Sequence, residues 1–318
     1  MSFPIGIDLG GTKIAGVLVN SKNKVIAEIK MNTQRKNQST GIDGIKAVIG
    51  QLLVESEVSP HKLTSIGLGV AGHVNVEQGI IIYCPNLPIK KLNVSSVLQK
   101  EYNIPVYIEN DANAAAIGEK YFGVAMDNEN FVCVTLGTGI GAGIFINGSV
   151  YRGSTGGAGE LGHMILDFSP DAPLCGCGNR GCFEALASGT AVARKAKEIF
   201  ATHPDSLISS GVEAEGEITA RMVTKMAQKG NKVALKILKD AANIIGIGFA
   251  NIVNLFNPEK IIVTGSLVEA EDLILKPAIK IMTQRAFSTN ARVVKVVKSE
   301  LNNKAGVLGA TALGQIKL

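Results

Sequence analysis

The sequence predicts an α/β protein built from two related halves, and three observations lead to this prediction. Its 318 residues exceed the usual size of a single hydrophobic core, which favours two domains. Segments with the hydrophobic period of strands alternate with segments that have the period of helices. Residues 5–30 and residues 131–152 also share one pattern, in which β-branched runs flank a glycine-rich turn.

The shared pattern predicts the first strands of each half. Residues 5–30 contain three expected strands, joined by a Gly-Gly turn and by a second turn at Asn20 to Asn23. Aligned without gaps, Leu9-Gly10 lies opposite Leu136-Gly137 and Asn20 lies opposite Asn147. In the second copy, Asn147-Gly148 is typical of a type I′ hairpin.

The remaining elements alternate in the same α/β manner. Residues 202–216 are polar and are expected to form a surface excursion. The expected elements, in order, are a helix through Ile42 to Leu53 after Thr40, a strand at 66–70, a strand at 106–108, a helix at about 114–121, a helix at 244–256 that stops at Asn257-Pro258, a strand at 260–263, and a turn at Thr264 to Ser266 that leads into another helix.

Composition excludes several classes of function. The net charge of +5 is spread along the chain without a basic run, so nucleic acid is not expected as a partner. The longest apolar stretch, Ile244 to Phe256, is too short to span a bilayer and is expected to be a buried helix. Met1 to Gly6 leads straight into a strand rather than a secretory signal, so a cytoplasmic protein with reduced thiols is expected.

One segment carries a predicted zinc site. His163, Cys175, Cys177 and Cys182 form a Cys₃His ligand set within a glycine-rich stretch that is typical of an irregular loop. A disulfide is the first alternative, although 5 cysteines is an odd number. Scattered core cysteines are the second alternative, and we accept it for Cys84 and Cys133. The same loop carries Glu160 and Glu184, which suggest a pocket for a ligand rich in hydroxyl groups.

The two glycine turns are predicted to bind phosphate groups. Residues without Cβ let backbone N–H groups point into a concavity that an anion can occupy. Neither turn has the spacing of a P-loop or of a dinucleotide fingerprint, and a lone glycine turn is more often a simple hairpin. Asp8 precedes the first turn and is expected to hold a hydrated Mg²⁺ ion. The candidate phosphate-binding residues are Gly10, Gly11, Thr12 and Lys13 in the first turn and Gly137, Thr138, Gly139 and Gly141 in the second.

Two further positions complete the candidate site. Asp111 and Asn110 directly follow the expected strand at 106–108, where ligands of α/β proteins collect. Asp111 is therefore a candidate general base, with the cap of the following helix as its alternative role. Gly265 follows the strand at 260–263 and is a possible nucleoside contact, with a simple helix start as the equal alternative. A polyol pocket near a nucleotide is what phosphoryl transfer requires.

Six motifs lie along nearly the whole chain: DLGGTK from Asp8, PNLP from Pro85, ENDANAA from Glu109, LGTGIGAG from Leu136, GGAGELGH from Gly156, and CGCGNRGCFE from Cys175. Together these motifs resemble the ROK (repressor, open reading frame, kinase) family of sugar kinases, and most closely its bacterial glucokinase-like members. The resemblance implies an actin-like ATPase (ribonuclease H-like) fold with two α/β domains around a nucleotide and sugar cleft. The implied domains are residues 1–112, completed by a C-terminal helix within 305–318, and residues 113–304, which contain the zinc loop 156–184.

The resemblance also implies roles for individual residues. Asp111 matches the family's catalytic base, and Asn86 lies in a loop that often closes over the sugar. His163 would bind zinc through one ring nitrogen and donate to a sugar hydroxyl through the other. The positions that match sugar contacts are Asn110, Glu160, His163 and Glu184, and those that match zinc ligands are His163, Cys175, Cys177 and Cys182.

The implied activity is an ATP-dependent hexose kinase, most closely a glucokinase, with Mg²⁺ at the nucleotide, a structural zinc and a homodimeric assembly. Other sugars that such kinases use are N-acetylmannosamine, N-acetylglucosamine, fructose and mannose, and sequence separates these poorly. Sugar sensors and actin-like filament proteins are rival classes. The repressor branch carries a helix-turn-helix ahead of its body, which is not expected here because a strand begins by Pro4. Two departures from the family pattern occur. Thr264-Gly265-Ser266 stands in place of a richer glycine run, and Ala71-Gly72-His73 replaces the commoner Pro-Gly pair, with no role assigned to His73.

Overall fold

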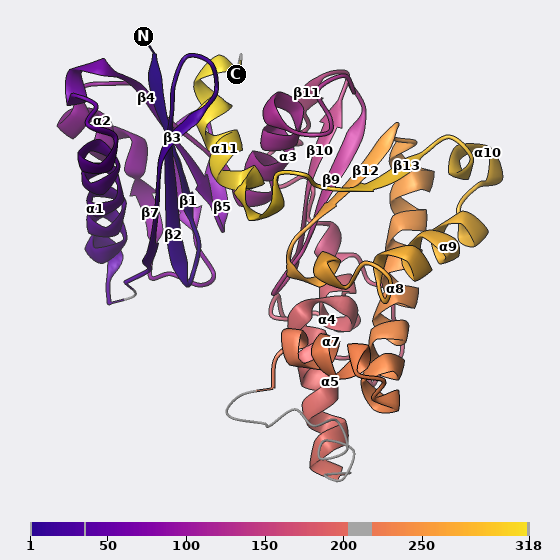
Figure 1. The fold of residues 1–318 in the computed structure, drawn as a ribbon. Helices are drawn as coiled ribbons and strands as arrows, with labels where there is room; N and C mark the ends of the chain where they lie inside the picture. The colour runs from indigo at the N-terminus through magenta and orange to yellow at the C-terminus, as the bar shows by residue number, and fades with distance from the viewer. Residues whose placement is uncertain (1, 35, 203–217, 317–318) are drawn as a thin grey trace. The chain divides into compact units, whose positions relative to one another are not determined.

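The structure is a computed structural model that describes residues 2–34, 36–202 and 218–316 (Figure 1). The chain forms two compact units, and each contains both strands and helices, so the α/β class is confirmed. The expected hinged domains 1–112 and 113–304 stay a prediction. Unit 1 comprises Met1–Glu129, Gly143–Gly159 and Ser299–Leu318, and unit 2 comprises Asn130–Ala142 and Glu160–Lys298.

Unit 1 is built on a five-stranded sheet with the order β3-β2-β1-β4-β8. β1, β2 and β3 are antiparallel neighbours, as the first glycine turn predicts, and β4 and β8 extend the sheet in parallel. The turn between β2 and β3 is closed by the Asn20 side chain, whose Oδ1 accepts hydrogen bonds from the backbone N–H groups of Lys22 and Lys24. The strands are β1 (Phe3–Leu9), β2 (Lys13–Val19), β3 (Val25–Asn32), β4 (Leu63–Val70) and β8 (Val106–Asn110).

Helices cover both faces of this sheet. α1 buries its apolar face against β2 and β3, which confirms the helix expected after Thr40. Its N-terminus carries a capping box formed by Asn37 and Thr40. On the opposite face, α11 contacts β1, β4 and α3. The helices of unit 1 are α1 (Gln38–Ser56), α2 (Val94–Tyr102), α3 (Asp111–Phe122) and α11 (Ala305–Ala312), with short 3-10 turns at Pro60–Lys62, Asn302–Lys304 and Leu313–Gln315.

A small antiparallel sheet follows β4 and was not predicted. Its strands are only three or four residues long, so their period of two is too brief to stand out in the sequence. The strands are β5 (His73–Asn75), β6 (Ile80–Tyr83) and β7 (Lys90–Asn93).

The second five-stranded sheet has the order β11-β10-β9-β12-β13, and the boundary between the units falls within β10. Its hairpin at Asn147-Gly148 is confirmed, because both residues have positive φ (50° and 73°), as a type I′ turn requires. The strands are β9 (Phe131–Leu136), β10 (Ile140–Ile146), β11 (Ser149–Val150), β12 (Lys260–Thr264) and β13 (Lys295–Lys298).

Unit 2 holds the remaining helices. The helix expected at 244–256 is the second half of α8, which begins earlier, at the cap Asn231, and ends where Asn257 adopts φ of 42° before Pro258. The residues after Gly265 form a 3-10 turn rather than the start of α9. The surface excursion predicted at 202–216 lies, after Thr202, outside the described residues. The elements are the 3-10 turns Leu161–His163 and Ser266–Ala270 and the helices α4 (Phe183–Ala187), α5 (Gly189–Thr202), α7 (Ala220–Gln228), α8 (Lys232–Phe256), α9 (Leu275–Arg285) and α10 (Ser288–Ala291).

The described helices also bear on the membrane question. Among the described helices α8 is the longest, and twelve of its residues between Ala234 and Val253 are buried within the protein. Among the residues that the structure describes, no helix combines the length and the apolar character needed to cross a bilayer. The interpretation of 244–256 as part of a buried helix is confirmed.

The contact between α11 and α3 generates a stability prediction. A Cβ at Gly309 would lie 1.8 Å from the backbone oxygen of Ala114, which neither helix can accommodate without moving apart. We expect Gly309→Ala to lower the free energy of unfolding by at least about 2 kcal/mol in urea denaturation. Gly50→Ala in α1 is the matched control, because no atom lies within 4 Å of its Cβ position and alanine favours helix by at most about 1 kcal/mol. Equal stabilities of the two variants would contradict this packing.

Candidate functional site

The end of β8 places two predicted site residues next to each other. Asn110 is the N-cap of α3, and its Oδ1 accepts hydrogen bonds from the backbone N–H groups of Ala112 (2.9 Å) and Asn113 (3.2 Å). Asp111 is the first residue of α3, and its Oδ1 also accepts from Ala112 N–H (3.0 Å). The cap therefore belongs mainly to Asn110, which differs from the alternative in which Asp111 is the cap.

Glu109 and Arg152 support this strand end, and neither residue was predicted to have a role there. The carboxylate of Glu109 is 1% exposed and forms an ion pair with Arg152, with 2.8 Å between Nε and Oε2. Its other oxygen accepts from the backbone N–H of Asn110 (3.0 Å). A glutamate inside an otherwise apolar strand was the available signal, because a buried carboxylate needs a partner.

Asp8 lies at the end of β1, in the same cross-strand row as Gly69 of β4 and Glu109 of β8. A Cβ at Gly306 of α11 would be 3.7 Å from Asp8 Oδ2 and 3.9 Å from the backbone oxygen of Asp111, so both aspartates meet this helix start. Burial raises the pKa of Asp8 to about 6, and the positive charge of Lys30 opposes that rise. An enclosed carboxylate of this kind suits a cation such as Mg²⁺.

The first glycine turn is closed by a hydrogen bond from Gly10 N–H to the backbone oxygen of Lys13 (3.1 Å). Thr12 and Lys13 are exposed, so their side chains are accessible to a ligand. Asn86 packs directly against this turn, because a Cβ at Gly11 would lie 2.5 Å from its Cβ. The structure thus brings Asn86 to the predicted phosphate turn.

The second glycine turn is held from two sides. The backbone oxygens of Gly137 and Thr138 accept hydrogen bonds from the first two residues of α5, Gly189 (2.8 Å) and Thr190 (3.2 Å). Gly141 N–H donates to the hydroxyl of Thr135 (3.1 Å). The contribution of α5 was not predictable from the sequence, because contacts between distant segments leave no local pattern.

Gly265 also belongs to this edge of the second sheet. It has φ of 103°, and a Cβ would lie 2.4 Å from the backbone oxygen of Leu136, the residue that precedes the second glycine turn. A side chain is therefore excluded on both grounds. Gly265 and Gly137 follow neighbouring parallel strands, β12 and β9, at the carboxyl edge where α/β proteins bind ligands.

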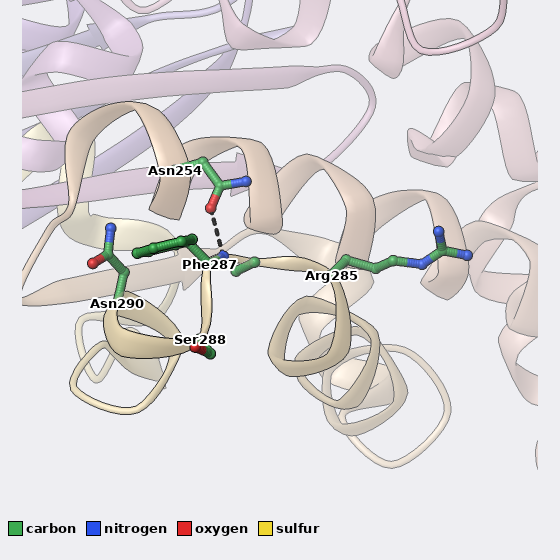
Figure 2. Close-up of a pocket in the computed structure, with 6 residues that line it drawn as sticks. Asn254, Arg285, Phe287, Ser288 and Asn290 are labelled. Carbon is green, nitrogen blue, oxygen red and sulfur yellow. Dashed lines mark hydrogen bonds between the residues drawn. The ribbon is translucent and has the colours of Figure 1, made fainter.

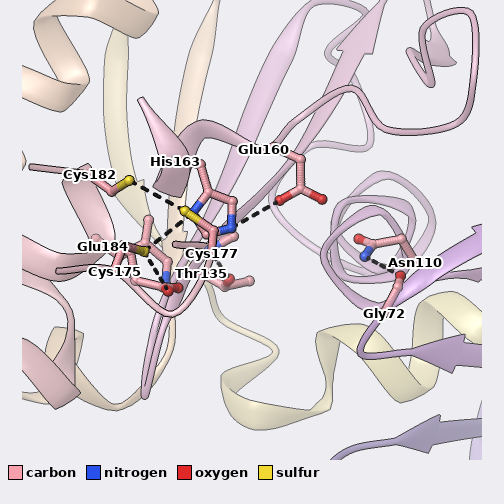
Figure 3. Close-up of polar contacts among 11 residues, drawn as sticks. Gly72, Asn110, Thr135, Glu160, His163, Cys175, Cys177, Cys182 and Glu184 are labelled. Carbon is pink, nitrogen blue, oxygen red and sulfur yellow. Dashed lines mark hydrogen bonds and ion pairs between the residues drawn. The ribbon is translucent and has the colours of Figure 1, made fainter. Parts of the chain in front are cut away.

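The four predicted zinc ligands gather in unit 2 (Figure 3). One ligand atom from each of His163, Cys175, Cys177 and Cys182 lies within 4.8 Å of all the others. Cys175 Sγ is 3.7 Å from His163 Nδ1, and Cys177 Sγ is 3.7 Å from Cys182 Sγ. The structure pairs none of these cysteines in a disulfide, and Cys84 and Cys133 are buried in the core, as expected.

The residues fit a zinc ion. A tetrahedral zinc with ordinary bond lengths separates two sulfurs by about 3.8 Å and a sulfur from a nitrogen by about 3.5 Å. Two of the six separations, each 3.7 Å, are close to these values, and all four ligand atoms lie within 4.8 Å of one another. Burial and the neighbouring sulfurs raise the pKa of the Cys182 thiol to about 12, so this fully buried group needs a cation beside it to ionise at neutral pH.

Two carboxylates extend from this cluster. Glu160 Oε2 lies 3.8 Å from Nε2 of His163, on the opposite side of the ring from the sulfurs (Figure 3). Glu184 has one oxygen 4.0 Å from Cys175 Sγ, while its other oxygen accepts from Ile140 N–H (2.8 Å). Glu184 therefore connects the cysteine cluster with the end of the second glycine turn.

The predicted residues thus form one group within each unit. Unit 1 holds the first turn, Asp8, Asn86, Asn110 and Asp111. Unit 2 holds the second turn, Gly265, the cysteine cluster, Glu160 and Glu184. His73, in β5, lies against Gly157, 3.7 Å from the Cβ position there.

A groove of about 590 Å³ lies elsewhere in unit 2 (Figure 2). Asn254 of α8 accepts a hydrogen bond from the backbone N–H of Phe287 (2.8 Å) at its wall. Arg285, Ser288 and Asn290 complete the polar lining. None of the predicted site residues lines this groove.

The raised pKa of Asp8 predicts a pH-dependent stability. Ionisation of Asp8 opposes folding, because its pKa in the folded protein (about 6) exceeds the ordinary value of 3.8. We expect Asp8→Asn to be more stable than the parent above pH 6 by at most about 3 kcal/mol, and this gain to vanish as the pH falls towards 4. Urea denaturation between pH 4 and 8 measures it, with Asp43→Asn on the exposed face of α1 as control. A gain that grows on acidification would contradict the prediction.

Comparison with known proteins identifies the family. Residues 4–316 match the ROK family model. The glucokinase of Streptomyces coelicolor is 35% identical over 319 residues, covering 99% of this chain and 98% of that protein. The xylose repressor of Bacillus subtilis is 31% identical over 311 residues, covering 98% of this chain and 76% of the repressor. The crystal structure of a ROK family glucokinase from Streptomyces griseus with glucose and AMPPNP superposes with a TM-score of 0.84, at 32% identity over 98% of both chains. These similarities confirm the actin-like ATPase fold, and the chain belongs to the ROK family.

Proposed function

We propose that this protein is an ATP-dependent hexose kinase that transfers the γ-phosphate of ATP to the 6-hydroxyl of glucose. Membership of the ROK family and its similarity to glucokinases support a sugar kinase. The single observation that carries the proposal is the strand end of β8, where Asn110 caps α3 and Asp111 stands beside it with Asp8 at the same helix start.

In this proposal Asp111 is the general base. It accepts the proton of the attacking sugar hydroxyl, and the oxygen then bonds to the γ-phosphorus as the bond to ADP breaks. Asn110 and Asn86 contact the sugar. Mg²⁺, held near Asp8, would neutralise charge that develops on the phosphates.

The nucleotide is assigned to the glycine turns. The first turn supplies Gly10, Gly11, Thr12 and Lys13, and the second supplies Gly137, Thr138, Gly139 and Gly141. Gly265 stands beside the second turn, where its lack of a side chain allows close approach of the Leu136 backbone, and it is the proposed nucleoside contact. Backbone N–H groups in such turns favour phosphate oxygens.

A structural zinc is proposed for His163, Cys175, Cys177 and Cys182. Their separations suit four-coordinate zinc, which leaves no open position for an activated water. Nδ1 of His163 faces the sulfurs, so Nε2 remains to donate to a sugar hydroxyl, with Glu160 next to it. Glu184 is the third proposed sugar contact of this unit.

The choice of glucose rests on the glucokinase relatives. N-acetylmannosamine, N-acetylglucosamine, fructose and mannose are the alternative substrates. A sugar sensor without turnover is the second candidate function, because the xylose repressor of Bacillus subtilis is 31% identical. The presence of both Asp111 and the two glycine turns favours the kinase.

We further propose a cytoplasmic homodimer. Thiols that are not in disulfides support a reducing compartment. The dimer is supported by the family resemblance. Light scattering after size-exclusion chromatography would give the molar mass of the assembly and so test it.

The proposed kinase activity predicts which product forms and which substitution lowers kcat. ATP with Mg²⁺ is expected to convert glucose to glucose 6-phosphate, identified by NMR within a panel of the alternative sugars.

Asp111→Asn is expected to lower kcat by roughly 10²- to 10⁴-fold, because asparagine keeps the shape and lacks the proton acceptor.

Asp43→Asn is the control for this substitution, because Asp43 is an exposed residue of α1 outside the proposed site. This variant is expected to keep full activity. Turnover of an N-acetylhexosamine alone would retain the kinase and refute glucose. No turnover of any sugar by the parent would favour the sensor. Normal kcat in folded Asp111→Asn would reduce Asp111 to a residue of the helix start.

Removal of the zinc tests whether the metal orders the sugar-binding residues and takes no part in phosphoryl transfer. We expect one zinc per chain by elemental analysis, and for Cys177→Ala a loss of the metal, a lower melting temperature and loss of glucose binding by calorimetry. ATP binding should decline less, since among the contacts above only the hydrogen bond between Glu184 and Ile140 links the cluster to the second turn. Cys133→Ala, at a buried cysteine of β9, is the control that keeps zinc. A zinc-free Cys177→Ala protein with parental sugar binding would refute the zinc's role.

A further inference from the structure

The ion pair between Arg152 and Glu109 stands directly behind the strand end that carries Asn110 and Asp111. Glu109 is almost completely buried, and the side chain of Arg152 is 22% exposed. Unpaired burial of a carboxylate is costly, so Glu109 needs a cation or several donors. Arg152 supplies the cation through its Nε at 2.8 Å.

The two oxygens of Glu109 have different tasks. Oε2 binds Arg152, while Oε1 accepts from the backbone N–H of Asn110 (3.0 Å) and from the side-chain amide of Asn113 (3.1 Å). Asn110 is the last residue of β8, and Asn113 lies in the first turn of α3. One carboxylate therefore joins the end of the strand to the start of the helix, on both sides of Asp111.

Arg152 is itself fixed in a closed loop. Its backbone oxygen accepts from Ala158 N–H (3.0 Å), and Gly153 has φ of 69° in the turn between them. The loop lies against β5, where a Cβ at Gly156 would be 3.3 Å from the backbone oxygen of Val74. The guanidinium is thus presented to Glu109 from an anchored segment rather than from a loose surface loop.

We propose that Arg152 is a positioning residue for phosphoryl transfer, which acts through Glu109 to fix the backbone of Asn110 and hence the direction of the Asp111 carboxylate. The inference rests on the proposed function, because it requires Asp111 to be the general base. Arg152 touches neither reacting group in this scheme. Its charge also compensates that of Glu109, so that Asp111 does not face an uncompensated carboxylate two residues away.

Removing Arg152 alone would leave Glu109 buried without its cation, a change that often unfolds proteins. The informative variant is therefore the double substitution Arg152→Met/Glu109→Gln. It removes both charges, and the amide oxygen of glutamine still offers an acceptor to Asn110 N–H. Arg152→Lys keeps the positive charge and serves as the conservative variant. The matched control is Lys46→Met/Glu101→Gln, which removes a partly exposed ion pair between α1 and α2 in the same unit.

The measurement is steady-state glucose phosphorylation at saturating sugar, with melting temperature recorded for each variant. We expect the double variant to lose roughly 10- to 100-fold in kcat, because small misplacements of a reacting group cost this much. Its KM for ATP should stay within about twofold of the parent value, since the glycine turns are intact. Arg152→Lys should recover most of the loss, and the control pair should match the parent.

A comparison of backgrounds separates positioning from general destabilisation. In an Asp111→Asn protein, adding the double substitution should change kcat by less than about twofold, because residues that act through one group are not additive. A merely structural defect would lower the active fraction equally in both backgrounds, and that result would overturn the inference. So would parental kcat in the folded double variant.

The activity of the parent protein separates a failure of this inference from a failure of the proposed function. If it phosphorylates sugar and the double variant does so equally well, the inference fails and the proposed function stands. If the parent turns over no sugar, both fail, because there is no general base to position.

Discussion

The arrangement of unit 1 depends on how closely the backbone of α11 approaches its neighbours. A Cβ would lie 2.1 Å from Val307 O at Gly6 and 1.8 Å from Ala310 O at Gly67, so the helix rests on the bare backbone of β1 and β4. Gly118 of α3 meets α11 at Ala305 in the same way. Packing at this distance places the N-terminus of α11 at the ends of β1 and β8. The positions of Asp8 and Asp111 therefore depend on glycines, whose lack of side chains allows α11 to pack this closely.

Unit 2 achieves order by a different means. Its segment 160–182, before α4, contains one 3-10 turn and two isolated antiparallel bridges, Ile165 with Cys182 and Leu174 with Arg180, so regular ladder hydrogen bonds are few there. Glu184 adds a side-chain connection, because it accepts from Ile140 N–H while it lies next to Cys175. The first turn of α5 then fixes the opposite side of the second glycine turn. Polar contacts thus supplement the buried apolar side chains Leu161, Ala172 and Phe183 around this loop.

Local signals in the sequence predicted local structure well. The turn at Asn20, the hairpin at Asn147-Gly148 and the stop of α8 at Asn257 each depend on a few neighbouring residues, and the structure confirms them. The clustering of the cysteines was also predictable, because ligand type and spacing are both written in one short segment. Arg152 was not, since its partner Glu109 lies 43 positions away and the pairing exists only after folding. The short strands β5 to β7 escaped detection for want of length.

Asp8 has a consequence for how a cation would enter this protein. With a pKa of about 6, its carboxyl group retains an appreciable fraction of protons under mildly acidic conditions. A metal that settles beside it must then expel hydrogen ions into the solvent, so binding and acidity become opposed. Below pH 6 each further unit of acidity weakens such binding about tenfold through this one group. If Mg²⁺ binds at Asp8 as proposed, its occupancy there would depend on the proton concentration of the surroundings.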